Sequence, residues 1–416
     1  MEMWIVSVGE PLPVDGKEVR LRRMGNLAMY AAQNKVDVNW FSVSFDHYKK
    51  QQRCSEDTAF DINQRFKLNL AYVGGYRKNV SFARIKHHKQ AGRKILAYME
   101  QVYLQKKPDV IIASMEPLEV SQAAVQFAAE HHIPIVVDVR DLWPEIYYDV
   151  IPRCLHWALD VYVRKCKKTL HGTLSRCDAI IGLSEGFLQY GLRYAGRERR
   201  QNDGVYPIAY PNYDYASYSP KFQQCWGSFG LKESDFIVSF LGNFGDQFSF
   251  DEIVEASKAL KDKKDIKFVL CGNGKHEEEI RAMTGDNVVI PGWIEKEQIL
   301  SLLSHTKLGI APYINSMNYR LNTPNKFGEY LSAGLPIAVA VSGEMERLLT
   351  ERQCGYAYHS SEDLIRIIEK YYNDSALREQ HSHNAKALYE DMFNGDKANQ
   401  KLLTHILSVA NLSIPD

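Results

Sequence analysis

The chain has 416 residues, 45% of them hydrophobic and 25% charged, and its 51 Lys and Arg balance its 51 Asp and Glu. This length favours two domains over one core, and the composition excludes a disordered chain. The seven cysteines form no Cys-x-x-Cys pair and no apolar run reaches about 18 residues, which argues against a disulfide framework, a zinc site and a membrane span.

Short β-rich runs alternate with helical stretches through the first half of the chain. Apolar runs of about four to eight residues between turn signals are typical of parallel strands buried on both faces. Two long segments between them, 79–107 and 153–176, are basic and amphipathic and predict helices. The strands predicted in this half are 3–8, 36–43, 110–115, 133–139 and 179–183.

The pattern starts again after 210–220, a segment rich in Pro, Asn, Asp and Ser that we interpret as a linker. We therefore predict an α/β fold with two Rossmann-like doubly wound domains facing a central cleft, residues 1–212 and 213–394, and a C-terminal helix at 395–416 that packs back on the first. The strands predicted here are 236–241, 266–271, 288–290, 308–311 and 337–341, with helices at 250–260 and 295–303.

The balanced total hides an uneven charge distribution. Residues 1–212 hold thirty Lys and Arg against twenty-three Asp and Glu, a net charge of +7, and the remainder has the opposite balance. The basic helices supply much of this excess and predict an anionic partner for the first domain, such as a phospholipid surface, a lipid-linked diphosphate or nucleic acid. An ordinary solvated helix face is the alternative. We expect a cytoplasmic protein, peripheral on the inner face of the plasma membrane.

A glycine turn follows the predicted strand 236–241, in the stretch FLGNFGDQFSF. A strand that runs through glycines into a helix can cradle a phosphate, because backbone N–H groups and the helix N-terminus approach the anion closely. Gly242, Asn243 and Gly245 are the candidate residues. The alternative is a simple crossover turn, which is the better interpretation for the next glycine turn at 268–275.

The most specific segment is TPNKFGEYLSAGLPIAVAVSGEMERLL, at 323–349. It resembles the donor-binding signature of glycosyltransferase family 4, the retaining enzymes of GT-B fold. The resemblance implies that Glu329 binds the ribose hydroxyls of a nucleotide and that Lys326, one helical turn earlier, meets its diphosphate. The residues that match in order are Pro324, Lys326, Glu329, Tyr330, Ala333, Gly334 and Pro336.

The stretch VVIPGWIEKEQILSLL, at 288–303, is similar to the part of that family whose backbone reads the nucleotide base. The chain also departs from the family: Leu321 stands where a second glutamate is common, and Asp246 and Gln247 stand where relatives carry Arg and Lys. Trp293 belongs either to the base pocket or to the core. The donor-binding residues that the resemblance implies are Gly242, Asn243, Gly245, Gly292, Trp293, Ile294, Pro324, Asn325, Lys326 and Glu329.

Several segments of the first half, GEPLPVDGKEVRLRRMGNLA (9–28), SFDH (44–47), NVSFAR (79–84) and DVRDLWPE (138–145), resemble a subgroup that builds O-antigen and capsule repeat units on polyprenyl diphosphate. Polar residues after strand ends are candidates for a cleft, although a structural ion pair or cap is an equal alternative for each. The acceptor candidates are Gly16, His47, Arg84 and Arg140. The catalytic candidates are Glu329, Lys326, Asp141 and Glu116.

The resemblance implies a retaining hexosyl- or N-acetylhexosaminyltransferase that moves a sugar from a nucleotide diphosphate sugar to a saccharide acceptor, lipid-linked, in bacterial surface-polysaccharide synthesis. It implies front-side departure of the diphosphate and no cofactor. No metal is expected either, since the tandem histidines at 87–88 and 131–132 are predicted on exposed helices. Nucleic acid is not expected as a partner. A non-hydrolysing nucleotide-sugar epimerase and a non-catalytic binding subunit of an assembly complex remain the alternatives.

Overall fold

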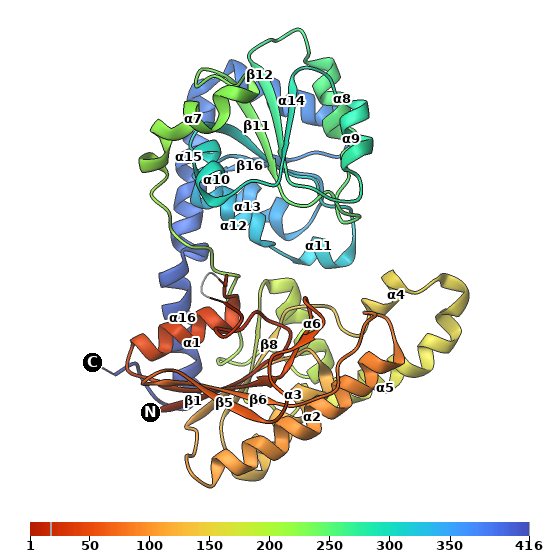
Figure 1. The fold of residues 1–416 in the computed structure, drawn as a ribbon, viewed down its shortest axis with the longest axis vertical. Coiled ribbons are helices and arrows are strands. Elements are labelled where there is room, and N and C mark those ends of the chain that lie inside the picture. Colours follow the sequence, from red (N-terminus) through yellow and green to blue (C-terminus); the bar gives the residue numbers. More distant parts are fainter. Residues whose placement is uncertain (17–18, 416) are drawn as a thin grey trace. The chain divides into compact units, whose positions relative to one another are not determined.

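The computed structural model describes residues 1–16 and 19–415, apart from the side chains at 149, 150 and 158. The chain divides into two compact units (Figure 1): Met1–Pro207 with Ala398–Asp416, and Ile208–Lys397. The last helix, α16 (Gly395–Val409), therefore starts in the second unit and belongs for most of its length to the first. The predicted loop 9–28 includes positions 17 and 18, which lie outside the described residues.

The first unit is built on one eight-stranded sheet. Its strands are β1 (Glu2–Val6), β2 (Asp37–Val43), β5 (Thr58–Asn63), β6 (Phe66–Ala71), β7 (Val110–Ser114), β8 (Ile135–Val139), β9 (Ala179–Gly182) and β10 (Gly204–Val205). They run in the order β10-β9-β8-β7-β1-β2-β6-β5, and β5 pairs antiparallel to β6 at the edge. The order reverses between β1 and β7, which is the switch point where doubly wound sheets bind ligands. A small hairpin, β3 (Phe45–Asp46) and β4 (Gln51–Gln52), follows β2.

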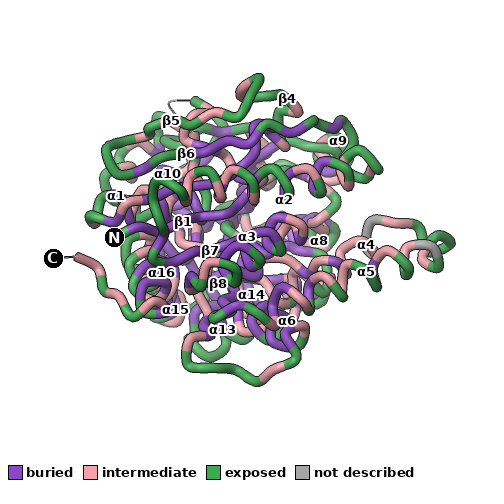
Figure 2. The backbone as a smooth tube through the Cα atoms, turned by 90° about the horizontal axis from the view of Figure 1, so that it is seen from below, coloured by how far each residue is buried: buried purple, intermediate pink, exposed green. Residues whose placement is uncertain are grey.

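Helices cover both faces of this sheet, so β1, β7 and β8 are buried throughout (Figure 2). On one face α1 and α16 share a core with Met3 and Ile5. On the other, the Trp4 ring stacks on Phe127 of α3. The helices of this unit are α1 (Arg23–Gln33), α2 (Phe82–Tyr103), α3 (Leu118–His131), α4 (Tyr147–Val150), α5 (His156–Leu174) and α6 (Glu185–Ala195), with a 3-10 turn at Arg153–Leu155.

The second unit is a six-stranded, fully parallel sheet. It contains β11 (Phe236–Leu241), β12 (Ile266–Cys271), β13 (Val288–Gly292), β14 (Thr306–Ala311), β15 (Ile337–Val339) and β16 (Gly355–Ala357). The order β13-β12-β11-β14-β15-β16 is the Rossmann order, with its switch point between β11 and β14. Its helices are α7 (Phe222–Trp226), α8 (Asp251–Ala259), α9 (Glu277–Met283), α10 (Lys296–Leu303), α11 (Met317–Leu321), α12 (Asn325–Ser332), α13 (Glu344–Arg352), α14 (Ser361–Asn373) and α15 (Ser375–Leu388).

The prediction of an α/β fold with two Rossmann-like domains is confirmed, and each of the ten predicted strands is present. The hairpin of β5 and β6 was not predicted. The segment 210–220, expected to be a linker, lies inside the second unit instead. Tyr210 is buried in the core of that unit, and a 3-10 helix at Tyr215–Lys221 follows it.

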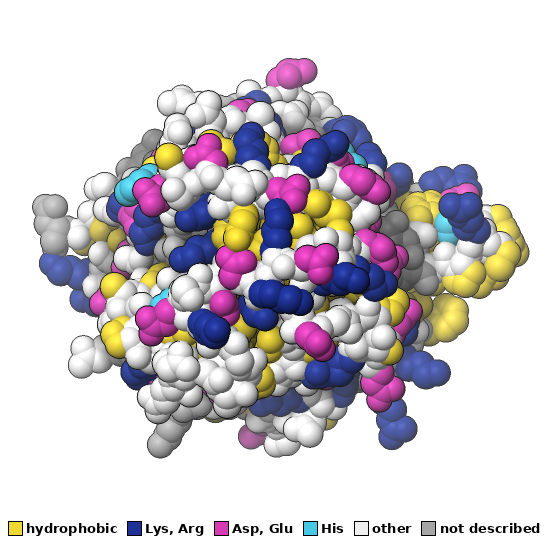
Figure 3. All heavy atoms as spheres, turned by 90° about the horizontal axis from the view of Figure 1, so that it is seen from above, with side chains coloured by type: hydrophobic (Ala, Val, Ile, Leu, Met, Phe, Trp, Pro, Cys, Tyr) yellow, Lys and Arg dark blue, Asp and Glu magenta, His cyan; other side chains and the backbone are white. Residues whose placement is uncertain are grey.

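Surface charges of the two signs are interspersed on the face seen in Figure 3 rather than gathered by sign. Within the described part of the chain, no helix is both long enough and apolar enough to cross a membrane.

Candidate functional site

Three glycine loops meet at the carboxyl edge of the second sheet, after β11, β12 and β13. Gly272 has φ +135°, and a β-carbon there would lie 1.8 Å from the carbonyl oxygen of Gly242. The Gly272 N–H donates to the carbonyl of Gly292 (2.8 Å), and the Phe244 N–H donates to that of Asn273 (2.9 Å). The loops therefore support each other through backbone contacts that leave no room for a side chain.

The side chains of the first glycine loop bond within the loop or to its neighbour. The Asn243 Oδ1 accepts from Gln247 (2.6 Å). Asp246, the acid that stands where relatives carry a base, pairs with Lys275 and His276 of the next loop, both at 2.8 Å. Lys275 thus supplies a positive charge to this edge from a different strand, which the sequence analysis did not anticipate.

Lys326 lies directly beneath the first glycine loop. It is only 6% exposed, and its ammonium lies 4.2 Å from the centroid of the Phe240 ring. A β-carbon at position 242 would come within 2.8 Å of its Nζ, so Gly242 makes room for the lysine. Burial lowers the pKa of Lys326 to about 8, although Glu329 acts in the opposite direction. Among the described residues no carboxylate or carbonyl oxygen accepts a hydrogen bond from this ammonium.

Tyr330 fixes the helix that carries Lys326. Its hydroxyl accepts from the Leu241 N–H (3.1 Å) and lies 3.2 Å and 3.3 Å from the carbonyl oxygens of Ser239 and Ile310. These groups belong to β11 and β14, the two strands at the switch point. The ring packs on Gly309, where a β-carbon would approach it to 2.7 Å. One tyrosine thereby holds α12 over the point where ligands bind in such sheets.

Glu329 lies on the same helix, partly exposed. Its Oε1 accepts a hydrogen bond from the Tyr210 hydroxyl at 2.5 Å. Tyr210 is itself held by Tyr389, whose hydroxyl donates to the Tyr210 carbonyl (3.0 Å), and by the Phe393 carbonyl, which accepts from its N–H. The carboxylate that the sequence analysis singled out is therefore oriented by a residue 119 positions away.

Three polar atoms just before α12 are buried without a hydrogen-bond partner among the described residues: Asn318 Oδ1, Asn322 Oδ1 and Thr323 Oγ1. They flank Leu321, the position where relatives commonly carry glutamate. Buried polar atoms without partners are costly and uncommon, and a bound ligand is one explanation for them. Sequence reasoning missed this group, because Asn and Thr before a helix are ordinary loop residues. Pro324 and Asn325 follow as the N-cap and first residue of α12.

The residues at the end of β13 and just after it differ in how exposed they are. Gly292 is committed to the loop contact with Gly272, and Ile294 is buried. Trp293 is 70% exposed, and its indole N–H lies 3.2 Å from Glu295 Oε1. Of the two alternatives for Trp293, the exposure excludes the core, and the ring can contact a planar ligand.

The first unit carries an ionic network at its own switch point. Arg140, after β8, pairs with Glu10, and its Nη2 donates to Ser114 Oγ (2.8 Å). Arg23 forms a two-bond pair with the buried Asp138 at 2.7 and 3.1 Å. Burial opposes the charge on Arg140, but Glu10 and Asp138 raise its pKa above the usual range. For Arg140 the structure therefore shows an ion pair.

Two further carboxyl groups, Glu116 and Asp141, are brought together beside this network. The Asp141 N–H donates to Glu116 Oε1 at 3.2 Å. Burial, followed by the charge of Asp141, raises the pKa of Glu116 well above its ordinary value. Burial also raises the pKa of Asp141, against the effect of Arg140. Raised pKa values make each carboxyl more ready to hold a proton than usual, which suits these groups to bind a sugar hydroxyl.

His47 and Arg84 lie together in a second group, around Tyr76. His47 Nδ1 is 2.6 Å from the Tyr76 hydroxyl, and the Arg84 guanidinium is 5.9 Å from the Tyr76 ring. His87 and His88 are buried on the same helix as Arg84, so the prediction that this pair is exposed was wrong. At Gly16 an added β-carbon would have no heavy atom within 4 Å, so the space beside this residue is open.

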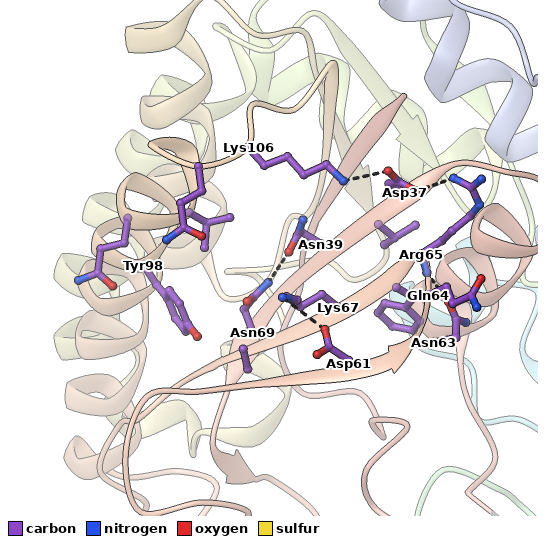
Figure 4. A pocket seen from close by; sticks show the side chains of 16 residues that line it. Asp37, Asn39, Asp61, Asn63, Gln64, Arg65, Lys67, Asn69, Tyr98 and Lys106 are labelled. Carbon is purple, nitrogen blue, oxygen red and sulfur yellow. Dashed lines mark hydrogen bonds and ion pairs between the residues drawn. The ribbon is translucent and has the colours of Figure 1, made fainter.

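A separate hollow of about 500 Å³ lies between α2 and the amino ends of β2 and β6 (Figure 4). Its polar groups pair with one another, as in Lys106–Asp37 (2.9 Å) and Asn69–Asn39 (2.9 Å). It lies at the amino ends of the strands, whereas the switch-point residues described above follow the carboxyl ends. Over the described residues, no group of three or more His, Cys, Asp or Glu is arranged to hold a metal ion.

Comparison with known proteins identifies the second unit. Residues 227–388 match the protein family described as glycosyl transferases group 1. This match covers most of the second unit, and at that level the resemblance to glycosyltransferase family 4 is confirmed. No curated protein sequence matches the chain.

Solved structures share the whole fold at low sequence identity. The sucrose-phosphate synthase of Thermosynechococcus elongatus has a TM-score of 0.67 and 14% identity, over 96% of this chain and 97% of that one. HepE of Anabaena in complex with UDP has a TM-score of 0.63 and 12% identity, over 98% and 99%. WaaG, a glycosyltransferase involved in lipopolysaccharide biosynthesis, has a TM-score of 0.62 and 14% identity, over 98% and 99%. These similarities establish the GT-B type of two-domain fold.

Proposed function

We propose that this protein is a retaining glycosyltransferase that takes a UDP-sugar in its second unit and transfers the sugar to a saccharide acceptor held by its first. The observation that carries the proposal is the buried ammonium of Lys326, which lies beneath the Gly242 loop and has no hydrogen-bond acceptor among the described residues. A buried cation without an internal hydrogen-bond acceptor is expensive and fits an anionic ligand. A nucleotide diphosphate matches this charge.

The residues around Lys326 fit the other parts of a nucleotide sugar. Glu329, oriented by Tyr210, can accept two hydrogen bonds from the ribose diol. The exposed ring of Trp293 suits the face of the base. The unpaired oxygens of Asn318, Asn322 and Thr323 can accept hydrogen bonds from the hydroxyls of the transferred sugar, in the place of the glutamate that Leu321 replaces. HepE, which shares the fold, was solved with UDP.

The chemistry follows from the family's retention of configuration. When the acceptor oxygen attacks the face that the diphosphate leaves, the leaving oxygen can take the acceptor proton. The charge that develops on the diphosphate is then stabilised by Lys326 and by loop amides fixed before the reaction, which is the efficient form of electrostatic catalysis. Glu116 and Asp141 are proposed to hold the acceptor hydroxyl by hydrogen bonds and take no part in this proton transfer.

The acceptor is proposed to be a lipid-linked saccharide of bacterial surface-polysaccharide synthesis, met at the inner face of the plasma membrane. On α5, Trp157 is 74% exposed and Val161, one turn on, is 65% exposed. Arg164 and Lys168 continue the same helical face. An aromatic and apolar strip beside basic residues favours the surface of an anionic bilayer, to which each basic residue adds about 1 kcal/mol. Lys167 is excluded from this strip, because it pairs with Glu145 at 2.9 Å.

The test is transfer by the purified chain with UDP-glucose or UDP-N-acetylglucosamine and a short-chain prenyl-diphosphate saccharide as acceptor. We expect UDP and glycosylated acceptor in equal amounts, with the anomeric configuration of the donor retained. Release of UDP with an epimerised sugar and no transfer would establish the epimerase instead. Binding of UDP without turnover of any sugar would establish the non-catalytic subunit.

Two variants distinguish the site from the fold. Glu329→Gln should lower UDP affinity roughly tenfold or more, since hydrogen bonds to a charged acceptor contribute about 1.5–3 kcal/mol. Glu255→Gln, on the exposed face of α8 with only Lys258 as partner, is the matched control and should bind UDP as the parent does. Equal UDP affinity of the two variants would contradict the role of Glu329.

A further inference from the structure

A compact group of side chains follows β2 and β6 in the first unit, and we name it the Tyr76 cluster: His47, Lys50, Tyr76, Arg84, His87 and His88. The Lys50 ammonium lies 4.6 Å from the centre of the Tyr76 ring and 3.4 Å from His47 Nδ1. The Arg84 Nε is 3.3 Å from His88 Nε2. The guanidinium also lies 5.5 Å from the Trp143 ring. Two cations therefore share one aromatic surface.

Local backbone structure holds these two cations in place. The Asp46 carboxylate accepts from the Tyr48 and Lys49 N–H groups and shapes the turn that carries Lys50. Asn79 binds both cations: its Oδ1 accepts from Lys50 Nζ (2.6 Å), and its carbonyl accepts from Arg84 Nη1 (3.0 Å). Ser81 caps α2 by accepting from the Arg84 N–H. The like charges are thus brought together by neutral oxygens.

No carboxylate of the described residues forms an ion pair with Lys50 or Arg84. The nearest acid, Asp46, is paired with Arg53 at 3.4 Å. Burial, and then the neighbouring Arg84, lowers the pKa of Lys50. Burial, Lys50 and Arg84 together lower the pKa of His47 to about 4. Lys50 and Arg84 therefore have no ion-pair partner among the described residues, and their charges oppose protonation of His47 more than Asp46 favours it.

We propose that the Tyr76 cluster binds a phosphate or diphosphate group, and that this group belongs to the acceptor; the second part rests on the proposed function. Phosphate oxygens take hydrogen bonds from an ammonium and a guanidinium together, and a dianion matches the charge of two cations. The surrounding rings limit screening by water and strengthen the attraction. A saccharide linked to a lipid through a diphosphate has this chemistry, and a neutral saccharide does not.

Binding is tested with inorganic pyrophosphate, titrated by calorimetry into protein whose donor site is saturated with UDP. We expect the parent to bind, and Lys50→Met and Arg84→Met each to weaken binding roughly tenfold or more. Lys49→Met is the matched control and should bind as the parent does, since among the described residues the Lys49 ammonium donates only to the Asp15 carbonyl. Failure of the parent to bind, or equal affinity of parent and both variants, would overturn the proposal.

A second measurement needs no variant. The imidazole signals of His47 are followed by NMR against pH, with and without pyrophosphate, in UDP-saturated protein. A bound anion should raise the pKa of His47 towards its usual range because it compensates Lys50 and Arg84. An unchanged His47 titration at saturating pyrophosphate would overturn the site.

The acceptor assignment is tested separately from glycosyl transfer. A soluble prenyl-diphosphate saccharide should compete with pyrophosphate, whereas vesicles of phosphatidylglycerol should bind parent and Lys50→Met equally. Loss of vesicle binding in Lys50→Met with unchanged pyrophosphate affinity would assign the cluster to lipid headgroups and overturn the proposal. These measurements detect binding alone, so an absence of sugar transfer would remove the proposed function without touching the anion site.

Discussion

The two switch points of this protein are built from different materials. In the second unit, backbone atoms form most of the site. The glycine loops contact each other through carbonyl and N–H groups, and one buried lysine supplies the positive charge. In the first unit, ionised side chains lie at the corresponding switch point of a larger sheet, whose strands from β6 to β9 follow the same order as the six strands of the second unit. A backbone site changes little when side chains vary, whereas a side-chain site can be remodelled by substitution. The first unit is therefore where we expect specificity for the acceptor to reside.

The largest expected effect comes from placing a side chain in the backbone site. Gly272→Ala puts a β-carbon against the Gly242 carbonyl in a conformation that L residues rarely adopt, which should cost about 3 kcal/mol of unfolding free energy and remove UDP binding. Gly172→Ala, in the interior of α5 with open space at the β-carbon, should instead stabilise by about 0.5–1 kcal/mol. Urea unfolding measures both. Equal effects would show that the loops are not built as described.

The stability of the first unit should depend on pH, because it buries a neutral histidine. Burial, followed by Arg84, lowers the pKa of His88 to about 3, from 6.5 when unfolded. Its contribution to stability is present above pH 6.5 and is lost as pH falls through about 3, a loss on the order of 3 kcal/mol. His88→Gln should flatten this part of the profile. If the stability of His88→Gln fell with pH between 6.5 and 3 as steeply as that of the parent, His88 would not be a buried neutral histidine.

The buried ammonium of Lys326 should lower the stability of the second unit and raise its affinity for UDP. Lys326→Met removes a buried charge without an internal partner, so the unfolding temperature should rise, while UDP affinity should fall by about 1.5–3 kcal/mol. Lys258→Met, on the surface, should change neither. If Lys326→Met loses stability and keeps UDP affinity, the lysine is structural.

The same lysine predicts how UDP binding depends on pH. Because its pKa is about 8 in the free protein, a diphosphate must bind the charged form. UDP affinity should decline as pH rises above 8, and this decline should be absent in Lys326→Met. Calorimetry at pH 7 and 9 measures it, with the buffer ionisation heat varied as a check on proton uptake.

A smaller effect is expected where the second unit uses a side chain to orient another. Tyr210→Phe removes the hydrogen bond to Glu329 and should weaken UDP binding by about 0.5–1.5 kcal/mol with little change in stability. Tyr213→Phe is the control from the same segment. A loss of stability without a change in affinity would make Tyr210 a core residue only.

The strands that could be predicted were those whose apolar sequence indicates that both of their faces are buried. The strands from Phe236–Leu241 onward are short, mostly apolar runs, and the doubly wound class was predicted from their alternation with helices. The hairpin of β5 and β6 was missed because its connection, Gln64–Arg65, has no glycine and β5 alternates exposed and partly buried residues. Periodicity alone does not separate such an edge strand from a loop.

The candidate site was predictable only in part, for a related reason. The motif around Lys326 and Glu329 is local in the sequence, so its helix could be placed. The contact from Tyr210 to Glu329 joins residues 119 apart, and no local pattern reports it. The burial of His87 depends on the turn at Gly74, whose carbonyl lies 2.6 Å from its Nδ1. The position of Glu329 and the burial of His87 both depend on contacts between residues far apart in the sequence.

The course of α16 has a consequence for how the protein is made. Leu402, Leu403, Ile406 and Leu407, close to the end of the chain, are buried in the core of the first unit, while the second unit is complete at Lys397. A ribosome therefore releases the segments of the first unit long before the helix that finishes its core. The second unit can fold during synthesis, whereas part of the apolar surface of the first stays uncovered until α16 has been synthesised. The half of the protein synthesised first is the half that is finished last.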